Sequence, residues 1–252
     1  MNFHGKIFIM LNNEQIGVSA EIAIADIFDI PVNDQYRNRG VKSITNAIKP
    51  IVANIFNTNN IPSPIKHAAE NQNIVDFILQ NNKTLSVKTN KQKLGKAAPQ
   101  KIGQASSNTW YAILAERLGI AYIPTAYPEK VKLFKIIALT RIEELLGIYW
   151  EYMFDCDFLV HIFNVVDSED NPTDDPKYIV IKKTSSPIWD PAKISFTKTT
   201  VAEWNESNTV KYEYDGVAIG EFQVHNNRDN FKFRFNMAGI YKLMSEDRLN
   251  FS

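Results

Sequence analysis

Cysteine is nearly absent from this sequence of 252 residues, in which Cys156 is the single one. One thiol excludes an intramolecular disulfide and a cysteine-based zinc site, and it fits a reducing compartment. Long apolar runs are also missing, because no stretch approaches the roughly 18 residues that a membrane span needs. The first residues lack the small-residue cleavage site of a signal peptide. We therefore expect a cytoplasmic protein without a membrane segment.

Net charge is the second absence, since Lys plus Arg and Asp plus Glu both total 28 and the formal charge is zero. The composition gives no general sign of a polyanionic partner, so a nucleic-acid function has to rest on local basic patches. The sequence also lacks a Gly-rich phosphate loop, a GxSxG elbow and an HExxH motif. Nucleotide hydrolysis, serine esterase and zinc protease functions are therefore left without local support.

The hydrophobic content of 44% is enough for a sizeable core. We expect one domain over residues 1–252 of the α/β (α+β) class, with a mixed central β-sheet flanked by helices. Residues 1–150 would hold most helices, and residues 157–252 would be rich in strands. Helices are predicted over 18–29 with Ser19 as the N-cap, and over 43–56, 108–118, 129–152 and 238–244. Strands are predicted over 74–80, 84–90, 158–166, 178–183, 193–198, 209–215, 217–225 and 231–237.

The strands at 74–80 and 84–90 are separated by Asn-Asn-Lys, which favours a tight turn and a hairpin. Strand side chains alternate between two faces, so Ser86 and Lys88 share a face, and the turn brings Asp76 close to them. Metal-dependent phosphodiester hydrolysis needs a carboxylate that holds Mg²⁺ and a cation that orients the attacking water or stabilises charge on the phosphate. The simpler interpretation is a surface hairpin on which Asp76 and Lys88 are ordinary polar residues without a catalytic role.

The segments IVDF (74–77) and LSVK (85–88) resemble the motif of the PD-(D/E)XK nuclease superfamily, and of type II restriction endonucleases in particular. The resemblance implies a restriction-endonuclease-like fold and Mg²⁺ as the cofactor. It implies Asp76 as the central metal ligand, the Val87 carbonyl as another ligand, and Lys88 as the catalytic lysine. Ser86 departs from the pattern, because it stands where the family usually has Asp or Glu. The family's missing carboxylate must then come from elsewhere in the chain.

Two residues are candidates for this missing group. The family often contributes a Glu from its first helix, which here would be Glu21, although a Glu in the first turn of a helix is also favoured by the helix dipole alone. Gln104 is the second candidate. If the segment PQKIGQ is helical, Gln104 and Gln100 lie one turn apart on the same side, but an amide cannot supply negative charge.

Residues for DNA binding are expected in two basic segments. The stretch from Lys83 to Lys101 carries six lysines and no acidic residue, although such a run is also typical of a solvated loop. Residues 219–235 combine a polar cluster with a strand whose outer face is basic, and they loosely resemble HxNR-like stretches of some restriction enzymes. Asn and Arg are residues that read adenine and guanine in the major groove, yet HNNRDN would also make a good turn. The predicted DNA contacts are Lys91, Lys96, Gln100, Lys101, His225, Asn226, Asn227, Arg228 and Arg234.

The sequence therefore predicts a type II restriction endonuclease that cuts a short site in double-stranded DNA. Palindromic sites imply a two-fold homodimer, and such an enzyme would have a cognate DNA methyltransferase encoded nearby. Two alternatives remain open. One is a repair or mobile-element nuclease of the same fold, and the other is a non-catalytic, sequence-specific DNA-binding protein in which Ser86 marks a decayed site.

Overall fold

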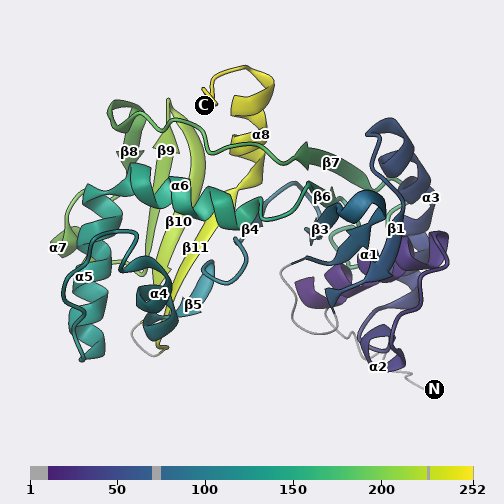
Figure 1. The fold of residues 1–252 in the computed structure, drawn as a ribbon, viewed down its shortest axis with the longest axis horizontal. Helices are drawn as coiled ribbons and strands as arrows, with labels where there is room; N and C mark the ends of the chain where they lie inside the picture. Colours follow the sequence, from purple (N-terminus) through teal and green to yellow (C-terminus); the bar gives the residue numbers. More distant parts are fainter. Residues whose placement is uncertain (1–10, 70–74, 226–227, 252) are drawn as a thin grey trace, which may run out of the picture. The chain divides into compact units, whose positions relative to one another are not determined.

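The computed structural model describes residues 11–69, 75–225 and 228–251. The chain divides into two compact units, each made of two separate stretches of sequence (Figure 1). Unit 1 comprises Met1–Leu94 and Cys156–Lys182, and unit 2 comprises Gly95–Asp155 and Lys183–Ser252. The chain thus passes from one unit to the other three times, and these boundaries differ from the subdivision near residue 150 that the sequence predicts.

Unit 1 is built on a five-stranded sheet of order β1-β2-β3-β6-β7. Its strands are β1 Pro64–His67, β2 Phe77–Leu79, β3 Thr84–Thr89, β6 Phe158–Phe163 and β7 Lys177–Lys182. The pairing of β3 with β6 is parallel and the others are antiparallel, so the predicted mixed sheet is confirmed. The predicted strands do not include β1, because Pro62 and Pro64 obscure its strand pattern.

The helices of unit 1 are α1 Asn13–Ile27, α2 Asp34–Arg37 and α3 Lys42–Thr58. Helix α1 packs on β3 and α3, and Leu85 and Val87 of β3 belong to the core that these elements share. The predicted start of α1 was wrong, because Asn12 and Gln15 form a capping box there. Ser19 lies inside the helix, where its hydroxyl donates to the Gln15 carbonyl.

The predicted hairpin is confirmed, since β2 and β3 pair antiparallel through Phe77–Leu85 and Ile78–Thr84. Asn81 and Asn82 both have positive φ, at 59° and 57°, in the turn between the strands. Asparagine tolerates this left-handed conformation better than most residues, which explains the tight reversal. The turn sets the register that places Asp76 beside β3.

Unit 2 contains a six-stranded sheet in which β4-β11-β10-β9-β8 are neighbours and β5 also pairs with β11. The strands are β4 Lys96–Ala97, β5 Gln104–Ser106, β8 Ile194–Phe196, β9 Thr209–Tyr214, β10 Val217–Val224 and β11 Asn230–Asn236. The helices are α4 Ser107–Leu114, α5 Tyr127–Thr140, α6 Ile142–Met153, α7 Val201–Asn205 and α8 Met237–Ser245. All register pairs in this sheet are antiparallel.

Helices α5 and α6 cover the aromatic face of β11, and Figure 1 shows α6 running across these strands. Phe231 stacks on Phe134 of α5 with ring centroids 4.2 Å apart, and Phe233 stacks on Tyr149 of α6 at 3.9 Å. The alternation predicted for β11 is therefore confirmed. Its aromatic residues are buried, and the basic residues between them point to the other face.

Two helix predictions in this part of the chain need correction. The helix predicted over 129–152 is interrupted at Arg141, whose φ of −134° is not helical, so that α5 and α6 are separate. The segment from Gln100 to Gln104 is a turn that leads into β5, and the predicted helical pairing of these two glutamines was wrong. None of the helices in the described residues combines the length and apolar character that crossing a membrane requires.

Candidate active site

Asp76 immediately precedes β2, and its backbone is held from both sides. Its N–H donates to the Leu85 carbonyl at 2.9 Å, and its own carbonyl accepts from the Ala68 N–H at 2.9 Å. These bonds continue the pairing of β2 with β3 and β1. The position of the Asp76 carboxylate therefore depends on the sheet itself.

The Asp76 carboxylate bonds directly to β3. Its Oδ2 atom accepts from the Ser86 hydroxyl at 3.1 Å and from the Val87 N–H at 2.6 Å. The Val87 carbonyl points toward Asp76 as well, because the N–H and C=O of a strand residue lie on the same side. Ser86, whose exposed fraction is only 2%, therefore helps to orient the Asp76 carboxylate.

Glu21 lies in the middle of α1 and is buried, with an exposed fraction of 7%. The helix dipole acts within the first turn, so it does not explain a carboxylate at this position. Oε2 of Glu21 accepts from the Tyr36 hydroxyl at 2.7 Å and lies 2.8 Å from Nε2 of His67. Tyr36 and His67 could not be recognised from the sequence, since neither shows a spacing typical of ligands.

The charges around Asp76 show that these groups lie within electrostatic reach of one another. Burial and the negative charge of Glu21 raise the pKa of Asp76 to about 6, whereas Lys88, the Val87 amide and the Ser86 hydroxyl act in the opposite direction. Glu21 comes from the helix that packs on one face of β3, and Lys88 leaves β3 from the other face. The charges of Glu21 and Lys88 thus act on the pKa of Asp76 in opposite directions.

Lys88 lies beside His161, its register partner on the parallel strand β6. His161 is fully buried, and its Nε2 atom lies 2.7 Å from Oδ1 of Asn90. Burial and the charge of Lys88 lower the pKa of His161 to about 3, so the imidazole is neutral at physiological pH. The His161 ring is thus hydrogen-bonded and neutral, and the positive charge beside it on β3 comes from Lys88.

The donor set around Asp76 suits a hard, hydrated cation. Two carboxylates in partly buried surroundings repel each other, and a cation relieves this repulsion. Within the described ranges, no three His, Cys, Asp or Glu side chains are grouped as a ready-made ligand set. Mg²⁺ commonly uses one or two carboxylates and keeps several waters, whereas structural zinc requires four protein ligands. Asp76, the Val87 carbonyl and Glu21 could thus hold Mg²⁺ with water completing its coordination.

Comparison with known proteins gives one informative relative. The chain is 28% identical over 240 residues to the type II restriction enzyme CviAII of Paramecium bursaria Chlorella virus 1. The chain is similar to a restriction enzyme. The match covers 94% of this chain, and therefore parts of both units, but the chain spans only 62% of the relative's length. No family model and no solved structure matches the chain.

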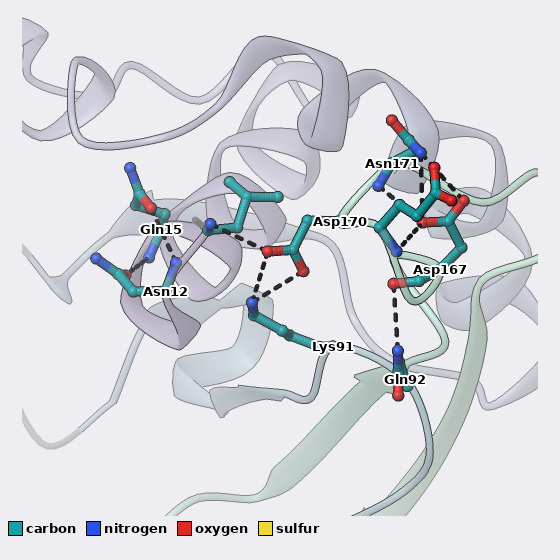
Figure 2. A network of polar contacts seen from close by, with 9 residues as sticks. Asn12, Gln15, Lys91, Gln92, Asp167, Asp170 and Asn171 are labelled. Carbon is teal, nitrogen blue, oxygen red and sulfur yellow. Dashed lines mark hydrogen bonds and ion pairs between the residues drawn. The ribbon is translucent and has the colours of Figure 1, made fainter. Parts of the chain in front are cut away.

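Lys91, a predicted DNA contact, is engaged within unit 1. Its ammonium lies 2.9 Å from both carboxylate oxygens of Asp170, and Asp170 also accepts from the Leu11 N–H at 3.2 Å (Figure 2). In the same network, Gln92 donates to the Asp167 carbonyl at 3.2 Å. Lys91 therefore connects the end of β3 to the acidic turn after β6, and its charge is largely compensated there.

Lys96 and Arg234 lie on the outer face of the unit 2 sheet, where both bind Glu221. The Lys96 ammonium is 2.6 Å from Oε2 of Glu221, and Arg234 donates to Oε1. Glu221 is only 2% exposed, and these two cations keep its pKa low against the effect of burial. The sequence analysis missed Glu221 because its cationic partners come from two other strands.

The other predicted DNA contacts and Gln104 also belong to unit 2. Gln104 is exposed on β5, opposite Lys232 of β11, and Gln100 and Lys101 lie in the preceding turn. His225 and Arg228 flank the turn between β10 and β11, and the Tyr127 hydroxyl donates to the carbonyls of both at 2.9 and 2.7 Å. Asn226 and Asn227 lie outside the described residues. The structure thus groups Asp76, Ser86, Val87, Lys88 and Glu21 in unit 1 and places Gln104 in the other unit.

Proposed function

We propose that this protein is a Mg²⁺-dependent type II restriction endonuclease of the PD-(D/E)XK kind. The observation that carries the proposal is the arrangement around Asp76. Its carboxylate accepts a hydrogen bond from the strand that carries Lys88, and the negative charge of Glu21 raises its pKa. The similarity to a protein named a type II restriction enzyme supports the same class of reaction. Ser86 marks a variant motif in which a helix supplies the second carboxylate.

In the proposed mechanism, each side chain has one task in phosphodiester hydrolysis. Asp76, the Val87 carbonyl and Glu21 would hold Mg²⁺, which neutralises charge on the scissile phosphate and acidifies a water. Lys88 orients the attacking water and stabilises the charge that develops on the phosphate. Ser86 and the Val87 N–H hold Oδ2 of Asp76 in place. His161 is neutral and therefore adds no second positive charge beside Lys88.

DNA binding in this proposal uses the outer face of the unit 2 sheet and the turn between β10 and β11. Lys232 is surrounded there by other cations, and burial together with the charges of Arg234, Arg228 and Lys96 lowers its pKa. Glu221 is the acidic group among them, so positive charge remains in excess, and phosphate groups would compensate it. We further propose a two-fold homodimer on a palindromic site and a cognate methyltransferase encoded nearby.

The proposal is tested by incubating the full chain with phage DNA in Mg²⁺ and by sequencing the cut termini. We expect discrete, reproducible fragments whose ends share one short sequence, and no cleavage in excess EDTA. Structure-dependent nicks without a common sequence would replace restriction by repair or mobile-element activity. Sequence-specific DNA retention without cleavage in Mg²⁺ or Mn²⁺ would instead indicate a decayed site.

The DNA surface of unit 2 is tested with Lys232→Gln, which removes one positive charge and keeps a polar side chain. DNA affinity is measured by fluorescence anisotropy at several salt concentrations, in EDTA so that no cleavage occurs. Because each neutralised phosphate contributes about 0.9 to the slope of log affinity against log salt, we expect the slope to fall by about that amount. Lys242→Gln, on the exposed face of α8, removes the same charge and should leave the slope unchanged. Equal slopes for all three proteins would rule out this surface.

A further inference from the structure

Glu21 is held by two side chains that act on the same carboxylate oxygen. The Tyr36 hydroxyl and Nε2 of His67 lie 2.7 and 2.8 Å from Oε2, and neither contact involves Oε1. The His67 side chain is fully buried and that of Glu21 is 9% exposed, so water does not compete freely for these bonds. The orientation of the Glu21 carboxylate is therefore set by protein groups.

The two partners of Glu21 come from different elements and are themselves fixed. His67 lies on β1 opposite Phe77, the residue that follows Asp76, and its ring packs against those of Phe77 and Tyr36 at 5.1 and 4.8 Å. Tyr36 belongs to α2, and the Arg39 guanidinium lies over its ring. Bonds from β1 and α2 thus hold the middle of α1, and β1 also pairs with β2, the strand that Asp76 precedes.

Burial alone would account for one hydrogen-bonding partner, because an unpaired buried carboxylate is costly. Two partners on Oε2 have a further effect, since they occupy that oxygen and leave Oε1 for other bonds. Tyr36 also lies within electrostatic reach of Asp76, whose charge helps to raise the pKa of its hydroxyl. The hydroxyl thus lies among the carboxylates of the proposed metal site and remains protonated as a donor.

We propose that Tyr36 and His67 are positioning residues that direct Oε1 of Glu21 toward the cation held with Asp76. This inference rests on the proposed function, and it assigns roles to two residues outside the nuclease motif. Partners of metal-binding groups typically affect metal affinity by 10- to 100-fold. The effect of losing Tyr36 should therefore be on Mg²⁺ affinity rather than on the rate at saturating Mg²⁺.

The test uses Tyr36→Phe, which removes only the hydroxyl. Mg²⁺ affinity is measured by calorimetry in the absence of DNA, and cleavage is followed over a range of Mg²⁺ concentrations. We expect the Mg²⁺ affinity to fall about 10-fold and the cleavage rate at saturating Mg²⁺ to stay close to that of the unchanged protein. Tyr178→Phe is the matched control, because its hydroxyl accepts from Asn54 in the same unit at 2.9 Å. It should change neither quantity.

Two further variants separate positioning from a general effect on the fold. Tyr36→Phe should have no additional effect on Mg²⁺ affinity in a Glu21→Gln background, because both changes act on the same bond. His67→Gln retains a donor nitrogen and should bind Mg²⁺ more tightly than His67→Ala at equal thermal stability. Equal Mg²⁺ affinities for Tyr36→Phe and Tyr178→Phe, in a protein that cleaves DNA, would overturn this inference alone. Absence of both Mg²⁺ binding and cleavage in the unchanged protein would overturn the proposed function and this inference with it.

Discussion

Lys88→Ala is expected to abolish DNA cleavage while leaving DNA affinity within about two-fold of the unchanged protein. Lys88 is the cationic side chain on β3, the strand that the Asp76 carboxylate contacts. Its neighbour His161 is neutral. Removing a group that stabilises charge in the transition state typically costs 10²- to 10³-fold in rate. We expect about the upper value, because the described arrangement offers no second cation beside Asp76 on this strand. The measurement is the single-turnover cleavage rate in saturating Mg²⁺.

Lys83→Ala is the matched control for this loss of charge. Lys83 lies on the same hairpin, pairs with Asp157 at 2.9 Å, and has a side chain that is 51% exposed. Exposed ion pairs contribute little to stability, so Lys83→Ala should cleave at nearly the original rate. A Lys88→Ala protein that cleaves as fast as Lys83→Ala would remove Lys88 from the mechanism.

Asp76→Asn should stabilise the metal-free protein at neutral pH, although it should also abolish cleavage. The amide oxygen can still accept from Ser86 and Val87, while the charge that burial and Glu21 disfavour is removed. The folded-state pKa of Asp76 is raised from 3.8 to about 6. Below about pH 3 the carboxyl is protonated in both states, and the two proteins should be equally stable. Between pH 3.8 and 6 the unfolded chain ionises first, so the unchanged protein progressively loses unfolding free energy, and above pH 6 the loss reaches about 3 kcal/mol.

Urea denaturation in EDTA at pH 4.5 and pH 7.5 checks this prediction. The stability gain of Asp76→Asn should be about one third of its full value at the lower pH and should reach its full value at the higher one. Added Mg²⁺ should then stabilise the unchanged protein but not Asp76→Asn, because a ligand raises stability only where it binds the folded state. The same gain at both pH values would show that the charge of Asp76 carries no penalty in the fold.

The local features of this chain could be predicted from its sequence because their signals are local. The Asn-Asn turn, the alternation of β11 and the Asp76-to-Lys88 spacing all depend on residues within a short window, and the structure has each of them. The true start of α1 also had a local signal, since Asn12 and Gln15 have the spacing of a capping box. Ser19 is also an N-cap residue type, and it precedes the more continuous apolar part of α1.

The features that could not be predicted depend on contacts between distant residues. Tyr36 and His67 are 15 and 46 positions from Glu21, and no periodicity links them. Glu221 likewise finds Lys96 at a separation of 125 positions. Arg141 interrupts a helical pattern without Pro or Gly, so nothing in the sequence marked the break between α5 and α6.

The three passages of the chain between the units have a consequence for how the protein is synthesised. Strand β3, which carries Lys88, has its parallel partner β6 in the second stretch of unit 1, more than 60 residues later. A ribosome therefore completes the whole first segment of unit 2, Gly95–Asp155, before the sheet that supports the hairpin can close. A fragment ending at Leu94 would lack that partner strand, and a protease cut in one connection would leave two others joining the units. Deletion mapping would accordingly find no single continuous fragment that retains the activity, even though the residues proposed for catalysis all lie in unit 1.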